Sequence, residues 1–281
     1  MRKIIAPVDF SENSWNALKA AIQYFKYEKC IFYLLHTYGE EVYANEEVTS
    51  RALLEEHKQI HHDRADGALD EILTKIKAYY PAPNHSYEKL PVFGYLLDEI
   101  HDLVEKENID LIVMGTKGKS DNKQLTYGSQ TLQVIKYVKC PVLAIPAVYS
   151  YERPSNILFP TNYMLPYRKR ELKLLSCLAK SYRATIHMLY LSNYERLSLR
   201  QEDNKALLSY SFRENSLQSV RQDYGPIVEK VNAYIKAEGI EMIVMVNTHH
   251  SYMEELLDQS NLDPICLHTE IPLLVLQNLA R

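Results

Sequence analysis

Three glycines and a serine follow the apolar run LIVM in the first half of the chain. In GTKGKSDNKQLTYGSQT, two residues separate Gly115 from Gly118, and nine separate Gly118 from Gly128, which Ser129 follows. Glycines allow positive φ and let an anion approach backbone N–H groups, while Gly128 and Ser129 open an expected helix with a positively polarised N-terminus. The spacing therefore favours phosphate binding, with a plain glycine-rich surface loop as the alternative.

Two other patterns in the chain do not complete a motif. The tripeptide GKS is not a Walker A loop, because Val113 stands where that motif needs its first glycine. Phosphate binding through backbone amides stays open, but P-loop motors and GTPases are excluded. The pairs His61-His62 and His249-His250 are adjacent rather than spaced i, i+4, so we expect no metal site.

Composition narrows the class of protein. The 281 residues include 32 Lys and Arg against 36 Asp and Glu, and the net charge of -4 gives no reason to expect nucleic-acid binding. We expect no signal peptide and no membrane span, hence a cytoplasmic protein. Four widely separated cysteines are expected to be reduced, buried thiols: Cys30, Cys140, Cys177 and Cys266.

An internal repeat divides the chain. The segment from Gly94 parallels the segment from Gly225, and the same offset of 131 residues relates Pro141 to Pro272. The starts match at an offset of 153, so the first copy has 22 extra residues, mostly in a polar stretch after Tyr38 that we expect at the surface. The repeat predicts two domains, residues 1–148 and 154–281.

The pattern within each copy predicts an α/β fold. The runs IIAPV, IFYLLH, LIVMG and VLAIP are expected strands, separated by expected helices over residues 14–27, 46–80 and 96–107. Such an alternation indicates a doubly wound, mainly parallel sheet. Ligands of these sheets bind beyond the strand carboxyl ends, which here means the loops after Val8, His36 and Met114.

In order along the chain, PVDFS, LLHT, Gly94, DLIVMGTKG and CPVLAIP resemble the landmarks of the universal stress protein family. ATP-binding members of that family carry G-x2-G-x9-G-[ST] after the fourth strand and an Asp after the first, and both are present. The resemblance covers nearly the full length. It implies two tandem Rossmann-like domains that form a pseudo-twofold pair within the chain, with a homodimer as a further possibility.

The resemblance also implies roles for individual residues. Asp9 would lie near the adenine or ribose and the backbone of Thr37 at the adenine edge, while glycines and hydroxyls would hold ribose and phosphates. Alternatively, Asp9 caps the following helix and Lys119 is a solvated surface charge. The expected nucleotide-binding set, with no catalytic residue and no metal ligand, is Pro7, Val8, Asp9, Thr37, Met114, Gly115, Gly118, Lys119, Gly128, Ser129 and Gln130.

The second copy lacks most of this site. At the matching positions the three glycines are Val246, His249 and Gln259, Asp9 is Asn162, and only the serine persists, as Ser260. Side chains at these positions would fill the phosphate channel and hinder positive φ. We therefore expect ATP in the first domain only.

The expected function is that of an ATP-binding regulatory protein of the stress response. ADP or AMP are alternative ligands, Mg²⁺ could bind through the phosphates, and the protein partner is unknown. Two other functions stay open, a slow ATP-hydrolysing or phosphoryl-transferring enzyme and a nucleotide-free scaffold. Efficient phosphoryl transfer needs metal ligands, a positioned nucleophile and cations, and only the phosphate loop is recognisable in the sequence.

Overall fold

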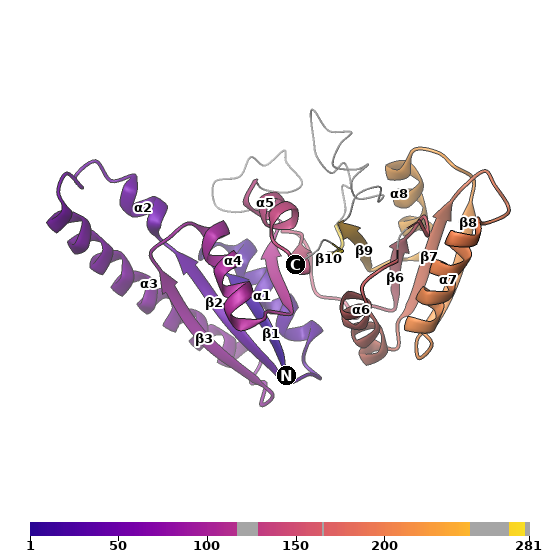
Figure 1. Ribbon diagram of the computed structural model, residues 1–281. Coiled ribbons are helices and arrows are strands. Elements are labelled where there is room, and N and C mark those ends of the chain that lie inside the picture. Colours follow the sequence, from indigo (N-terminus) through magenta and orange to yellow (C-terminus); the bar gives the residue numbers. More distant parts are fainter. Residues whose placement is uncertain (117–128, 165, 248–269, 279–281) are drawn as a thin grey trace.

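One sheet of ten strands runs through both halves of the molecule (Figure 1). The computed structural model describes residues 1–116, 129–164, 166–247 and 270–278. The strand order is β3-β2-β1-β4-β5-β10-β9-β6-β7-β8. Neighbouring strands are parallel except at the centre, where β5 (Val142–Ile145) and β10 (Leu273–Gln277) pair antiparallel. This arrangement confirms the doubly wound, pseudo-twofold pair expected from the sequence.

The first half lies on the left of Figure 1. Its long helix begins later than expected, because the Ser50 hydroxyl accepts a hydrogen bond of 3.3 Å from the Leu53 N–H and so caps the helix. Its elements before β5 are β1 (Arg2–Pro7), α1 (Glu12–Tyr24), β2 (Cys30–Thr37), α2 (Gly39–Tyr43), α3 (Arg51–Tyr79), β3 (His85–Val92), α4 (Leu96–Glu107), β4 (Leu111–Gly115) and α5 (Ser129–Tyr137).

The second half lies on the right of the figure and repeats the order of the strands. Its strands run β8-β7-β6-β9-β10 across the sheet, as β3-β2-β1-β4-β5 do in the first half. Its elements before β10 are β6 (Asn156–Pro160), α6 (Lys169–Tyr182), β7 (Thr185–Leu191), α7 (Leu199–Ser211), β8 (Ser216–Gln222), α8 (Ile227–Glu238) and β9 (Met242–Asn247).

Helices cover both faces of the sheet. Buried side chains of α1, α3, α6 and α7 share one hydrophobic core, and those of α4, α5 and α8 share the other. Successive strand residues alternate between the cores, so that Ile4 belongs to the first and its neighbour Ile5 to the second. Burial on both faces explains why the central strands are almost continuously apolar.

The two halves meet along β5 and β10. Leu143 pairs with Leu274 across this antiparallel seam, and both side chains are buried. Each strand would otherwise be an apolar edge open to pairing with other chains. The seam therefore makes one continuous sheet out of two repeats.

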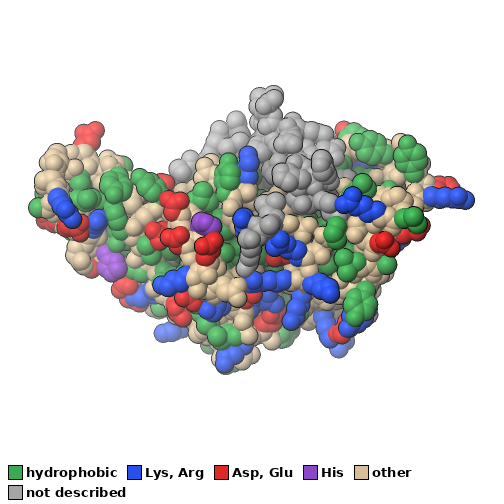
Figure 2. All heavy atoms as spheres, viewed as in Figure 1, with side chains coloured by type: hydrophobic (Ala, Val, Ile, Leu, Met, Phe, Trp, Pro, Cys, Tyr) green, Lys and Arg blue, Asp and Glu red, His purple; other side chains and the backbone are tan. Residues whose placement is uncertain are grey.

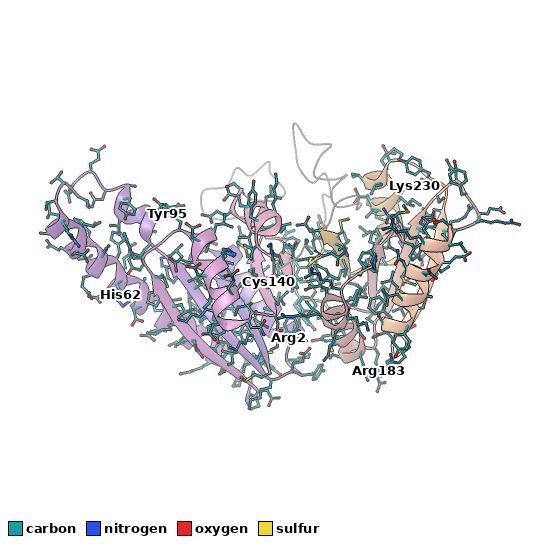
Figure 3. The ribbon with its side chains drawn as sticks, viewed as in Figure 1. Arg2, His62, Tyr95, Cys140, Arg183 and Lys230 are labelled. Atoms are coloured by element: carbon teal, nitrogen blue, oxygen red, sulfur yellow. The ribbon has the colours of Figure 1, made fainter. Side chains whose placement is uncertain are left out.

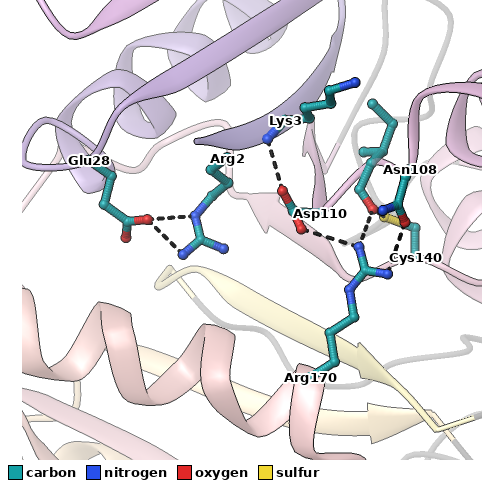
Figure 4. Close-up of polar contacts among 8 residues, drawn as sticks. Arg2, Lys3, Glu28, Asn108, Asp110, Cys140 and Arg170 are labelled. Atoms are coloured by element: carbon teal, nitrogen blue, oxygen red, sulfur yellow. Dashed lines mark hydrogen bonds and ion pairs between the residues drawn. The ribbon is translucent and has the colours of Figure 1, made fainter.

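A polar contact supports the seam at one side (Figure 4). Arg170 of α6 donates hydrogen bonds of 3.1 Å to Asn108 Oδ1, 3.2 Å to the Ile109 carbonyl and 3.2 Å to Asp110 Oδ1. The other Asp110 oxygen accepts from the Lys3 backbone N–H at 2.9 Å. The start of β1 and the turn before β4 are thus tied to the second half.

Charged side chains of both signs are interspersed over the face shown in Figure 2. Among the described helices, none combines the length and apolar character that crossing a bilayer requires. The described cysteines are free thiols: Cys30 and Cys140 are buried as expected, whereas Cys177 is only partly buried. Cys266 lies outside the described residues. Burial raises the pKa of Cys30 to about 12, so this thiol stays protonated and unreactive at neutral pH.

Candidate functional site

A pocket of about 470 Å³ opens at the carboxyl ends of β1, β2 and β4, beside the start of α5. This is the edge of the sheet where ligands of doubly wound folds bind. Eight of the expected site residues lie together in its wall: Pro7, Val8, Asp9, Thr37, Met114, Gly115, Ser129 and Gln130. The other three, Gly118, Lys119 and Gly128, lie outside the described residues.

Asp9 is held in a tight turn between β1 and α1. Its Oδ1 accepts hydrogen bonds from the Ser11 backbone N–H at 3.0 Å and from the Ser11 hydroxyl at 2.6 Å. Ser11 itself is the N-cap of α1, since its Oγ accepts from the Ser14 N–H at 3.2 Å. Asp9 thus orients the capping residue instead of capping the helix, and its carboxylate stays at the pocket wall.

Phe10 and His36 support this turn. The backbone of Phe10 is left-handed, with φ of 59°, and its ring lies 4.5 Å from the His36 ring. His36 Nδ1 lies 2.7 Å from the Val8 carbonyl oxygen, which can only accept, so Nδ1 carries a proton. His36 therefore connects the ends of β1 and β2, and it lines the pocket as well.

The opposite wall is built from β4 and α5. The Thr131 hydroxyl in the first turn of α5 donates a 2.9 Å hydrogen bond to the Gly115 carbonyl. Packing alone also favours glycine at position 115, because a Cβ on Gly115 would lie 3.1 Å from the Asn13 carbonyl oxygen. Ser129 and Gln130 are exposed at the start of the helix, where the macrodipole favours an anion.

Helix α2 forms a rim that the sequence did not predict. Glu40 and Glu41 line the pocket, and Glu41 Oε2 lies 3.3 Å from Nδ1 of His61 on α3. The helix can approach the β3–α4 loop because Gly39 donates from its N–H to the Gly94 carbonyl at 3.1 Å, and a Cβ on Gly39 would be only 2.6 Å from that oxygen. The rim therefore adds two carboxylates to that of Asp9.

Aromatic side chains extend this rim along its outer surface. The rings of Tyr43 and Tyr95 are stacked at 6.3 Å, and Phe93 packs beside Tyr43. Figure 3 places Tyr95 by α2 and His62 on α3, at the outer end of the first half. These contacts hold α2 beside the pocket.

In the second half the matching turn is covered by its own side chains. Asn162 Oδ1 accepts from the Met164 N–H at 3.0 Å, as Asp9 does from Ser11. Gln201, in the first turn of α7, donates from Nε2 to the Asn162 carbonyl at 2.9 Å and to the Tyr190 hydroxyl at 3.1 Å. Tyr163 is only 2% exposed. The turn geometry persists, while α7 closes over it.

The same half differs from the first on the β9 side. Val246 stands at the position of Gly115 and is 6% exposed. The other replaced positions, His249 and Gln259, and the retained Ser260 lie outside the described residues. Within the part of the chain that the structure describes, no three His, Cys, Asp or Glu side chains are grouped to hold a metal ion.

Comparisons with known proteins agree with this architecture. A model of the Universal stress protein family matches residues 1–146. A universal stress protein of Methanocaldococcus jannaschii is 30% identical over 154 residues, covering 51% of this chain and 94% of that protein. One of Bacillus subtilis is 27% identical over 145 residues, covering 51% of this chain and 97% of that protein.

Solved structures match over both halves. The crystal structure of a universal stress protein from Archaeoglobus fulgidus aligns with a TM-score of 0.68 at 17% identity, covering 98% of this chain and 96% of that one. A putative universal stress protein from Pseudomonas aeruginosa aligns with a TM-score of 0.55 at 12% identity, covering 99% and 93%. At these identities the likeness shows the shared fold, whereas the family match rests on sequence. The chain belongs to the universal stress protein family.

Proposed function

We propose that the protein is a nucleotide-binding regulator of the stress response, in which the first half binds one ATP. The observation that carries this proposal is the 470 Å³ pocket, which lies within the range of small-ligand sites and gathers the eight described site residues. The domain boundaries, residues 1–148 and 154–281, and a cytoplasmic location belong to the same proposal.

The pocket wall suits the parts of a nucleotide in turn. Pro7, Val8 and Met114 offer apolar surface for a base, and the carboxylate of Asp9 can accept hydrogen bonds from ribose hydroxyls. The start of α5 at Ser129 offers hydroxyl and N–H donors to phosphates. In the proposal, Gly118 and Gly128 complete the phosphate end, and Lys119 lies nearby.

Negative charge around the pocket affects which nucleotide binds and whether Mg²⁺ accompanies it. Asp9, Glu40 and Glu41 are all pocket carboxylates, and like charges near a triphosphate are unfavourable. A Mg²⁺ ion on the phosphates would reduce that repulsion. ADP and AMP carry less charge and are the alternatives that a competition experiment should include.

Occupancy of such a pocket can act as a switch without chemistry. A ligand that binds the native state stabilises it by about 2.7 kcal/mol at a hundredfold excess over its dissociation constant. A conformation favoured by the nucleotide could then present a different surface to a protein partner. The proposed regulation needs no more than this linkage.

The test is to identify what the purified protein binds. We expect denaturation of the intact chain to release an adenine nucleotide, and calorimetric titration of the stripped chain to show ATP binding that also raises the melting temperature. If no nucleotide is released, and if ATP neither gives a binding signal in the titration nor raises the melting temperature, the protein is a nucleotide-free scaffold. Multiple-turnover phosphate release that disappears in Asp9→Ala would instead show an enzyme.

A further inference from the structure

The last turn of α5 is held by two amide side chains from the other half of the chain. Asn247 Nδ2, at the end of β9, donates to the Ile135 carbonyl at 3.0 Å, and Gln277 Nε2, at the end of β10, donates to the same oxygen at 2.8 Å. We call Asn247 and Gln277 the amide pair. They contact the helix that borders the pocket of the first half.

The amide pair meets a helix end that needs a partner. α5 ends at Tyr137, so the Ile135 carbonyl is one of the last four carbonyls, which have no intrahelical N–H to accept from. Asn247 Nδ2 also donates to Gln277 Oε1 at 2.9 Å, which fixes the orientation of both amides. Gln277 is 2% exposed, so its amide is shielded from water and relies on these protein partners.

The other end of the same helix forms the wall of the pocket. α5 has nine residues, which span about 13 Å at 1.5 Å per residue. Ser129, Gln130, Thr131 and Gln133 line the pocket, and Thr131 is bonded to Gly115 of β4. A rigid helix of this length transmits a displacement of its last turn to its first.

The amide pair has no equivalent in the sequence of the first half. At the repeat offset of 131 residues, Asn247 matches Thr116 and Gln277 matches Pro146. Neither Thr116 nor Pro146 has an amide side chain with which to hold a helix of the second half. The half whose nucleotide motif is degenerate thus supplies amide donors at positions where the half with the intact motif has none.

We propose that Asn247 and Gln277 are positioning residues for the nucleotide site of the first half, acting through α5. This inference rests on the proposed ATP binding in that half. The amide pair sets where the N-terminus of α5 stands relative to Gly115, and hence how well its donors meet the phosphates. The second half therefore has a role in nucleotide binding even though it binds none itself.

The test compares three variants of the full chain by calorimetric titration with MgATP at 25 °C, after circular dichroism has checked that each is folded. Gln277→Met keeps the size of the side chain and removes the amide, and Asn247→Thr introduces the residue found at the matching position of the first half. Each variant removes one of the two donors that position the last turn of α5, so the proposal predicts about tenfold weaker ATP binding in either one. Asn278→Ser is the control, because the Asn278 side chain bonds the Arg168 N–H and the Pro166 carbonyl, both in the second half.

Hydrogen exchange separates positioning from general stability. ATP should protect the backbone amides of α5 in the unchanged chain, and this protection should weaken in Gln277→Met and Asn247→Thr. The control should bind ATP within about twofold of the unchanged chain, as surface substitutions usually do. A purely structural role would lower the melting temperatures of Gln277→Met and Asn247→Thr and leave the dissociation constants of all three variants equal.

Two results would overturn the inference. Equal ATP affinity in Gln277→Met, Asn247→Thr and the unchanged chain would refute the positioning role alone and leave the proposed function standing. No ATP binding by the unchanged chain would refute the proposed function and, with it, this inference. If Gln277→Met does not fold, the milder Asn247→Thr decides.

Discussion

Phe10 and Tyr163 occupy matching positions in the two halves, and both have a left-handed backbone, with φ of 59° and 57°. This conformation costs an aromatic L-residue about 1–2 kcal/mol. Each ring is held by a neighbour at the end of the second strand, Phe10 by His36 at 4.5 Å and Tyr163 by Tyr190 at 5.4 Å. The strained turn is thus present in both halves, and in the first half it lies beside the pocket.

We predict that Phe10→Gly is more stable than Phe10→Ala by about 1 kcal/mol. Both changes remove the ring and its contact with His36, so the difference isolates the cost of positive φ in a residue with a Cβ. Urea unfolding of the two variants measures it. Equal stability would mean that the turn relaxes to negative φ once the ring is gone.

Glycines in two settings should respond in opposite ways to alanine. A Cβ on Gly67, within α3, would have no neighbour within 4 Å, so Gly67→Ala should stabilise the protein by about 0.5–1 kcal/mol through better helix propensity. A Cβ on Gly115 would lie 3.1 Å from the Asn13 carbonyl oxygen, and Gly115→Ala should destabilise by about 1 kcal/mol. Urea titration of both variants checks the signs, and a gain in stability at Gly115 would contradict the packing argument.

Stability should fall in mild acid because of His187. This residue is 3% exposed, with Nδ1 3.0 Å from the Tyr234 hydroxyl and Nε2 3.2 Å from Asn156 Oδ1. Desolvation lowers its pKa below the 6.5 of a free imidazole, so over a range below pH 6.5 the unfolded chain binds more protons than the folded one. The contribution of His187 to the free energy of unfolding is therefore fully retained above pH 6.5, and it decreases as the pH drops below that value.

Unfolding in urea at pH 7.5 and 5.5 measures this effect. We expect His187→Gln to lose less stability between the two pH values than the unchanged chain. The pKa of His85 is also lowered by desolvation, so His85→Gln should reduce the pH dependence in the same direction. An unchanged pH dependence in His187→Gln would show that this imidazole does not contribute.

Much of the site could be predicted because it lies where buried strands end. Apolar runs identified β1, β2 and β4, and the rule for doubly wound sheets then pointed to Val8, His36 and Met114, which all line the pocket. Glu40 and Glu41 were missed, because α2 has only five residues in a polar stretch and shows no helical periodicity.

Other features depend on tertiary structure. β3 was missed because it is an edge strand with exposed residues alternating along it, so it lacks the continuous apolar run of its neighbours. Asn247 and Gln277 lie 112 and 142 positions along the chain from Ile135, which both of them contact. No local sequence pattern predicts contacts over such separations. The family resemblance implied that the halves pair, and the structure shows the seam through which they do so.

Substitution at the two matching turns should show that ATP binds one half only. Asp9→Asn keeps an oxygen that can accept from Ser11, as Asn162 does from Met164 in the second half, so the turn should survive. Loss of a charged acceptor costs about 1.5–3 kcal/mol, which predicts ATP binding roughly 10-fold to 100-fold weaker. Asn162→Ala should leave ATP affinity unchanged, because Gln201 already covers that turn.

Calorimetric titration of ATP into the intact chain, Asp9→Asn and Asn162→Ala measures affinity and stoichiometry together. The unchanged chain and Asn162→Ala should each bind one ATP per polypeptide, and circular dichroism should show that Asp9→Asn remains folded. If the chain bound two ATP, or if Asn162→Ala lost affinity while Asp9→Asn did not, the second half would hold a nucleotide site. Val246 and the side chains of α7 would then have to move aside, since both are packed in the positions that a ligand would need.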